Sequence, residues 1–368
     1  MERPHLKEKK KESISFEEIQ SWPKVDLHCH LDGSLRLETL IELAKSQGIK
    51  LPCSDIEGLK SHLGIGQAFS SLENYISVFD FTLNVLQSRE GLSRVAYELA
   101  EDASKENVVY LEVRFAPVFH TSYALKWSET VNSVLEGLKK AEKDFDINCR
   151  LILTGIRSMD PIISKELAEL AVAYKGKGVV GFDLAGAETH NSASDHTEAF
   201  YVIKNNNINC TLHAGEVEGR KSIHEALHYC GADRIGQGTR LIENSDLLNY
   251  VNDHRIPLEI CLSSAVNIGT HKTIDSHPFP FYLDYGLRVT LNSDSRLFTN
   301  TTVSQELMLA AKTFSLSKED LKKIIINGFK AAFLPYREKV TMMDKYLPRL
   351  GKKVPKFQAL RLIERDCD

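Results

Sequence analysis

The sequence predicts an α/β fold, a closed (β/α)8 TIM barrel with extra helices inserted after its first strand. Eight short runs rich in β-branched and aromatic residues recur along the 368-residue chain, and helical segments lie between them. After the second run, successive runs start roughly 25 to 40 residues apart, which is the length of a strand, a helix and two loops. Alternating strands and helices indicate a parallel sheet, and eight such units indicate that the sheet closes into a barrel.

The predicted strands follow one another in chain order. They are 25–30, 108–115, 150–156, 179–184, 210–213, 234–237, 258–261 and 288–292. Helical spacing of apolar residues, at i, i+3 and i+4, is clearest at 164–173 and 221–228. An open doubly wound sheet is the alternative, but it usually has fewer strands and a glycine-rich phosphate loop after the first one. Gly64-Ile65-Gly66 lacks the third glycine and follows no strand, which favours the barrel.

The segment between the first two strands is roughly 80 residues long, far longer than one crossover needs. Segments 40–44 and 72–86 have the pattern of amphipathic helices. An insertion that directly follows the first barrel strand lies at the C-terminal mouth, where it can roof a substrate. Extra helices that serve only packing are the alternative interpretation.

The composition is that of a globular domain, with 42% hydrophobic and 26% charged residues. The net charge of -4 gives the whole chain no electrostatic footprint for nucleic acid or for an anionic membrane. No apolar stretch approaches the roughly 20 residues of a membrane helix. We predict a charged N-terminal tail over 1–20, a single barrel domain over 21–345 and a C-terminal tail over 346–368.

The cysteine pattern indicates the cellular compartment of the protein. Seven are scattered along the chain without a CxxC pair, so neither a disulfide framework nor a thiolate zinc site is expected. The charged first residues lead into no apolar stretch, unlike a secretory signal peptide. These observations predict a cytoplasmic protein. The zinc deaminases of nucleic acids use an HxE…PCxxC pattern, and its thiolate pair is missing here.

Three histidines and one aspartate stand at the ends of predicted strands. His28 and His30 alternate along the first strand and therefore share a face, His213 ends the fifth strand, and Asp294 follows the eighth. Because the carboxyl ends of all barrel strands meet at one mouth, we expect the four side chains to converge. Three imidazoles and a carboxylate suit zinc and leave a position for water. Four unconnected polar residues at strand ends are the alternative.

Other polar residues stand close to these four in the sequence. Glu216 lies three residues beyond His213, where a buried carboxyl can move protons, or where it is an acid at a helix N-terminus. Asp32 and Ser34 either bind a polar substrate or cap the next helix. Gly186 lets a backbone N–H approach a ligand closely, or simply permits a turn.

Six sequence blocks follow one another along the chain. They are VDLHCHLDGSLR at 25–36, YLEVRFAP at 110–117, GFDLAGAE at 181–188, LHAGE at 212–216, ADRIGQGTRL at 232–241 and LNSDSRL at 291–297. In order and spacing, these blocks resemble the adenosine deaminase family of zinc-dependent amidohydrolases. The resemblance runs from about residue 20 to about residue 345. It implies the barrel fold and zinc-dependent hydrolytic deamination of adenosine to inosine and ammonia, a reaction of purine metabolism.

The resemblance also implies roles for individual residues. One zinc ion per chain is expected on the equivalents of the family ligands, which are His28, His30, His213 and Asp294. A zinc-bound hydroxide is expected to attack C6 of the adenine while Glu216 protonates N1. Substrate contacts are expected from His30 and from Asp32, which would bind the ribose 5′-hydroxyl. The N–H of Gly186 would face purine N3.

Four positions depart from the family pattern. Gln237 replaces the histidine of the family IGHG motif, and Ser295 replaces a second acid that contacts purine N7. Ala187 and Ala265 stand where relatives often have an acid and an asparagine. Glutamine can hydrogen-bond a catalytic water but cannot take its proton. The loss is roughly 10²–10⁴ in rate if the position is an indispensable base, and smaller if zinc and Asp294 already supply hydroxide.

The leading prediction is therefore an adenosine aminohydrolase that retains turnover. Two alternatives stay open: a deaminase of a different 6-aminopurine nucleoside, and a catalytically impaired nucleoside-binding paralogue. Gln237 favours the impaired paralogue, whereas the retained metal ligands and Glu216 favour an enzyme. The expected partner is a small purine nucleoside, with no nucleic acid and no membrane. The sequence does not predict an oligomeric state.

Overall fold

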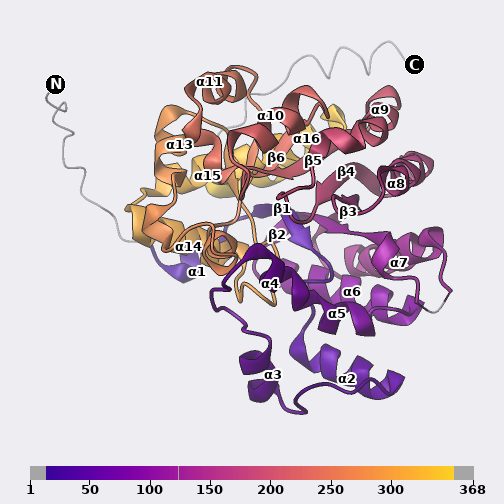
Figure 1. The fold of residues 1–368 in the computed structure, drawn as a ribbon. Coiled ribbons are helices and arrows are strands. Elements are labelled where there is room, and N and C mark those ends of the chain that lie inside the picture. Colours follow the sequence, from indigo (N-terminus) through magenta and orange to yellow (C-terminus); the bar gives the residue numbers. More distant parts are fainter. Residues whose placement is uncertain (1–13, 123, 352–368) are drawn as a thin grey trace, which may run out of the picture.

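A barrel of parallel strands forms the centre of the computed structural model, which describes residues 14–122 and 124–351 (Figure 1). The described strands are hydrogen-bonded in the order β1 to β8. They are β1 (Lys24–His30), β2 (Val108–Phe115), β3 (Asn148–Ile156), β4 (Val179–Ala185), β5 (Asn209–Ala214), β6 (Arg234–Gln237), β7 (Leu258–Ile260) and β8 (Val289–Leu291). Asp294 N donates to His28 O and His30 N donates to Asp294 O, each at 2.8 Å, which closes the ring. The predicted barrel and its eight strands are confirmed.

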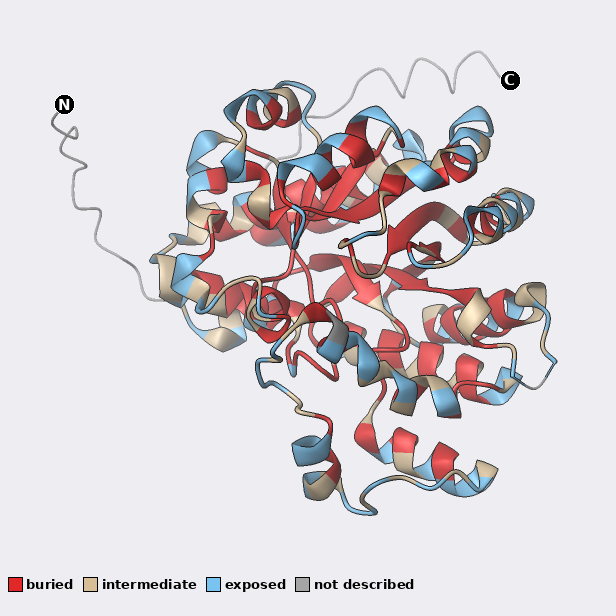
Figure 2. Ribbon diagram, viewed as in Figure 1, coloured by how far each residue is buried: buried red, intermediate tan, exposed pale blue. Residues whose placement is uncertain are grey.

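Helices surround the barrel and bury the face that points toward it (Figure 2). They are α1 (Phe16–Ser21), α2 (Leu37–Gln47), α3 (Ile56–His62), α4 (Leu72–Ser77), α5 (Phe79–Val85), α6 (Arg89–Lys105), α7 (Trp127–Asp144), α8 (Pro161–Ala173), α9 (Thr197–Asn205), α10 (Arg220–His228), α11 (Ser245–Asp253), α12 (Leu262–Asn267), α13 (Phe279–Tyr285), α14 (Val303–Phe314), α15 (Lys318–Ala331) and α16 (Tyr336–Tyr346). Every residue of β2 is buried, because a barrel strand is covered by side chains inside and by helices outside.

The pair α6 and α7 illustrates how local sequence sets this layer. Ser88 caps α6 by accepting a 3.1 Å hydrogen bond from Gly91 N. Gly137 of α7 lies so close to α6 that an added Cβ would stand 2.0 Å from Ser93 O. Only glycine therefore allows the two helices to pack at this distance.

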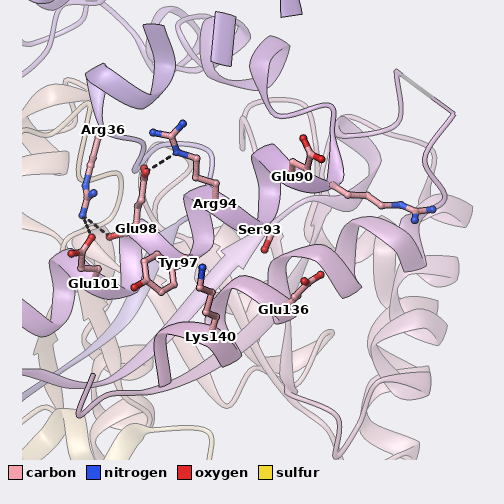
Figure 3. Close-up of a pocket in the computed structure, with 10 residues that line it drawn as sticks. Arg36, Glu90, Ser93, Arg94, Tyr97, Glu98, Glu101, Glu136 and Lys140 are labelled. Atoms are coloured by element: carbon pink, nitrogen blue, oxygen red, sulfur yellow. Dashed lines mark hydrogen bonds and ion pairs between the residues drawn. The ribbon is translucent and has the colours of Figure 1, made fainter. Parts of the chain in front are cut away.

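Charged side chains line a surface cleft over α6 and α7 (Figure 3). Arg36 pairs with Glu101 at 2.6 Å, and Arg94 pairs with Glu98 at 2.8 Å. Because cations and anions alternate and pair within the cleft, it presents no field of one sign to a ligand.

The inserted segment covers the mouth in part. The prediction of continuous helix over 72–86 is wrong at one point, since the chain divides into α4 and α5 at Val78. The division lets Tyr75 and Phe79 both contact the ring of Phe298, at centroid distances of 6.1 and 4.6 Å. An added Cβ on Gly33 would lie 2.4 Å from Ser295 Oγ and 3.1 Å from Phe79, so α5 packs on the loops after β1 and β8. This packing favours the interpretation that the inserted segment covers a substrate site at the mouth. The helices α2 and α3 lie farther from the barrel (Figure 1).

The first and last described helices lie at the boundaries of the two predicted tails. α1 crosses the predicted boundary at residue 20, and α16 crosses the one at residue 345. Most of both predicted tails lies outside the described residues, so this division of the chain stays a prediction. Within the described part, every helix is too short or too polar to span a membrane.

Candidate active site and metal centre

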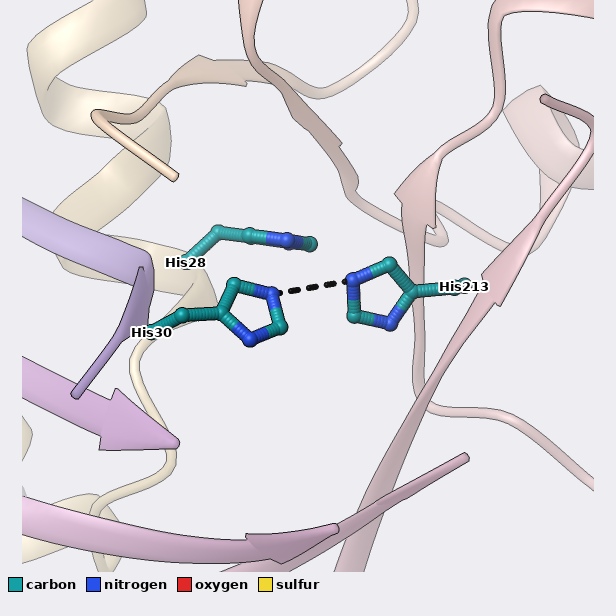
Figure 4. Close-up of side chains that lie close together, drawn as sticks. All are labelled: His28, His30 and His213. Carbon is teal, nitrogen blue, oxygen red and sulfur yellow. Dashed lines mark hydrogen bonds between the residues drawn. The ribbon is translucent and has the colours of Figure 1, made fainter. Parts of the chain in front are cut away.

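Three histidine rings meet at the C-terminal mouth of the barrel. His28 and His30 come from the end of β1 and His213 from β5, and Figure 4 shows the rings turned toward one another. His30 Nε2 lies 3.2 Å from His213 Nε2. One nitrogen of each ring lies within 4.8 Å of the others, close enough for the three to share one ion.

Asp294 joins this group from the loop after β8. Its Oδ1 lies 3.6 Å from His30 Nε2, and its carboxylate shares a second candidate metal group with His28 and Cys261. The backbone φ of Asp294 is +61° and that of Gln237 is +66°, both in the left-handed region. Such conformations cost about 1–3 kcal/mol each and persist where surrounding contacts fix them. The structure thus brings together all four residues predicted as ligands.

The protonation of His28 fits a metal ligand. His28 Nδ1 lies 2.8 Å from Glu259, and its buried Nε2 has no hydrogen-bond partner among the described residues. Burial lowers the pKa of His28 to about 4, so the ring is neutral and Nε2 offers a lone pair. His213 Nδ1 lies 3.2 Å from Asp183 in the same way. Histidines oriented by carboxylates are typical of metal sites, and this nitrogen and oxygen donor set suits zinc.

A buried charge network holds these carboxylates. Arg114 donates to Glu259 at 2.8 Å and to Asp183 at 3.3 Å. Arg234 also pairs with Glu259. Burial alone would raise the pKa of Glu259, but the two guanidinium groups hold this pKa well below its usual range. The sequence patterns did not predict this network, although charged residues inside strongly apolar strands are a signal for it.

Glu216 lies on the loop after β5 and is only 7% exposed. Burial raises the pKa of Glu216 to about 8, against the opposing effect of His213. The helix α10 begins at Arg220 with Gly219 as its N-cap, so the alternative of an acid in the first helical turn is wrong. Glu188, which the sequence did not single out, holds this loop. It accepts hydrogen bonds of 2.6 to 2.8 Å from the N–H groups of 215, 217 and 218.

The other predicted site residues surround the same mouth. Asp32 is 7% exposed, its Oδ1 has no partner within the described ranges, and burial raises its pKa to about 7. Gly186 has a φ of +105°, which favours glycine. Ser295 Oγ donates to Asp294 Oδ1 at 3.2 Å.

Gln237 contacts the candidate metal centre through a carboxylate. Its Nε2 donates to Asp294 Oδ2 at 2.9 Å, and its buried Oε1 is unpaired in the described part of the chain. Helix capping does not explain Asp32 or Ser34, because the N-cap of α2 is Arg36. Ser34 Oγ instead accepts from Arg296 N at 3.1 Å, which links the loops after β1 and β8.

Comparison with known proteins agrees with this geometry. The family model described as adenosine deaminase matches residues 23–347. The chain belongs to the adenosine deaminase family. Within the family it is 39% identical over 355 residues to the adenosine deaminase of Mycobacterium avium (strain 104), covering 91% of this chain and 96% of that protein.

Two further similarities broaden the comparison. A probable adenosine deaminase of Dictyostelium discoideum is 42% identical over 321 residues, which is 87% of this chain but 42% of that longer protein. The solved structure of the Arabidopsis N6-mAMP deaminase has a TM-score of 0.81 at 29% identity, covering 90% of this chain and 99% of that chain. The family membership thus shows an enzyme of the deaminase class.

Proposed function

We propose that this family member hydrolyses adenosine to inosine and ammonia, with one zinc ion on His28, His30, His213 and Asp294. The observation that carries the proposal is the convergence of three imidazoles and a carboxylate beside a buried carboxyl group, Glu216. When bound, zinc is a Lewis acid that lowers the pKa of a water molecule to about 7.

The side chains of the mouth have complementary roles in this proposal. Glu216 holds a proton at neutral pH and donates it to purine N1, which relieves the charge that develops when water adds at C6 and ammonia leaves. Gln237 orients the carboxylate of Asp294 through its 2.9 Å hydrogen bond. Asp294 would accept a proton from the attacking water and pass it to the departing amine, which leaves as ammonia, while the C6 hydroxyl proton returns to Glu216 as the carbonyl forms.

Residues on the loops around the mouth would orient the substrate. The unpaired oxygen of Asp32 would accept a hydrogen bond from the ribose 5′-hydroxyl, and His30 would line the same side of the site. The Gly186 N–H would face purine N3, and the Ser295 hydroxyl would face N7 as a neutral group. Because a carboxylate repels a phosphate, Asp32 favours a nucleoside over a nucleotide.

The deciding experiment is an absorbance assay of the zinc-loaded protein with adenosine, AMP and N6-methyl-AMP. We expect turnover of adenosine, its loss when a chelator removes the metal, and its return when zinc is restored. Faster turnover of either nucleotide would assign the chain a different 6-aminopurine substrate. Binding of adenosine without turnover, in wild type and in Gln237→His alike, would overturn the proposal in favour of a binding paralogue.

Gln237→His is expected to raise kcat for adenosine by less than about 10²-fold, the lower limit for a missing general base. The reason is that Gln237 already bonds Asp294 as a ring N–H would. Steady-state kinetics of both proteins at equal zinc content measure the change. A larger increase would show that the wild type lacks an indispensable base.

The activity is expected to fall at alkaline pH. Glu216 acts in its protonated form, and its pKa is raised to about 8. Therefore kcat/KM for adenosine falls about tenfold per pH unit above about pH 8. A profile of kcat/KM from pH 6 to 10 measures this limb. A rate that stays level to pH 10 would contradict protonated Glu216 as the acid.

We also propose a cytoplasmic location and a role in purine metabolism. The absence of nucleic-acid and membrane partners stays a prediction.

A further inference from the structure

The helix α10 carries two histidines one turn apart, in the sequence His224-Glu225-Ala226-Leu227-His228. The two imidazoles are exposed, and their ring centroids lie 4.5 Å apart. We propose that His224 and His228 form a second binding site for a divalent transition-metal ion such as Zn²⁺, separate from the barrel mouth. The proposal does not depend on the deaminase reaction.

Helical geometry supports the pair as ligands. Residues four apart on a helix project from the same face, with Cβ atoms about 5–6 Å apart. Two histidines in an HExxH sequence use this spacing to bind one zinc ion. Imidazole nitrogens suit Zn²⁺, Cu²⁺ and Ni²⁺, and exposure lets an ion from solution reach them with its remaining positions filled by water.

The glutamate of the sequence has a different task here. In metallopeptidases with HExxH, that glutamate is the general base beside the metal. Glu225 is buried instead, and it accepts hydrogen bonds from Ser192 Oγ at 2.6 Å and from Ala193 N at 3.1 Å. It therefore joins α10 to the loop before α9 and does not face solvent with the histidines. The site binds a metal ion without the base that peptide hydrolysis needs.

A third imidazole lies on the neighbouring helix end. The ring of Tyr250 is 4.8 Å from that of His228 and stacks on His254 at 4.0 Å. His254 Nδ1 lies 2.9 Å from Tyr250 O. Among the described residues, the three imidazoles do not form a group whose ligand atoms lie within 4.8 Å of one another, so the site consists of His224 and His228 alone.

The test counts bound zinc on the full chain after equilibrium dialysis against excess zinc chloride. Wild type is expected to hold one zinc ion more than His224→Gln and His228→Gln. His62→Gln is the matched control, because His62 is an exposed histidine on α3, and it is expected to match wild type. Deamination by His224→Gln is expected to equal that of wild type, since this site is distinct from the mouth.

Equal zinc content in wild type, His224→Gln and His228→Gln would overturn the proposal. Calorimetric titration of zinc into protein already loaded at the mouth gives the affinity of the added site. His254→Gln is expected to bind the added zinc ion with wild-type affinity, because His254 does not complete a group of three ligands with His224 and His228. A loss of affinity in that variant would contradict a site made of these two histidines alone.

Discussion

Glu216→Gln is expected to lower kcat for adenosine by roughly 10²–10⁴-fold, the contribution of a positioned general acid. Burial raises the pKa of Glu216 to about 8, so the wild-type side chain carries a transferable proton at neutral pH. Glutamine keeps the shape and a hydrogen-bond donor but has no proton to transfer. Adenosine binding is therefore expected to change little, and steady-state kinetics will show the effect in kcat more than in KM.

Glu218→Gln is the matched control for this variant. Glu218 lies on the same loop, two residues further along, and is exposed. The control is expected to keep the wild-type kcat and pH profile, and zinc content must be equal in all three proteins. Wild-type turnover by Glu216→Gln would contradict its role as the acid.

The sequence predicted the barrel because the barrel signal is local. Each strand, such as β2, is a short apolar run, and each helix has a periodic apolar face. The position of Val78 was not predictable in this way. The chain divides there so that Tyr75 and Phe79 both contact Phe298, which is more than 200 residues further along the chain. Tertiary contacts of this kind override a local helical pattern.

The four ligands were predictable because barrel topology places every strand end at one mouth. The residues that orient the ligands were not, since their partners are distant in sequence. Arg114 and Glu259 are 145 positions apart, and each looks locally like a charge misplaced in an apolar strand. Glu188 ends the GFDLAGAE block, but no local pattern indicates which groups it binds. Its role follows only from the three backbone N–H groups that surround Glu216 in the folded chain.

Glu259→Gln is expected to lower the free energy of unfolding by about 3–5 kcal/mol, the effect of breaking a buried ion pair from one side. Glu259 is fully buried and accepts hydrogen bonds from Arg114, Arg234 and Thr211. Glutamine would leave two buried guanidinium groups without their shared anion. Urea denaturation of the metal-free protein measures the loss.

The same substitution separates a structural effect from an effect on the metal centre. Because Glu259 also orients His28, metal affinity is expected to fall about 10–100-fold, as for other partners of metal-bound histidines. Glu101→Gln is the matched control: it removes a carboxylate paired with an arginine at the surface, Arg36, and is expected to cost at most about 1 kcal/mol. Unchanged metal affinity in Glu259→Gln would mean that the barrel holds His28 in place without this carboxylate. The buried network would then stabilise the fold alone.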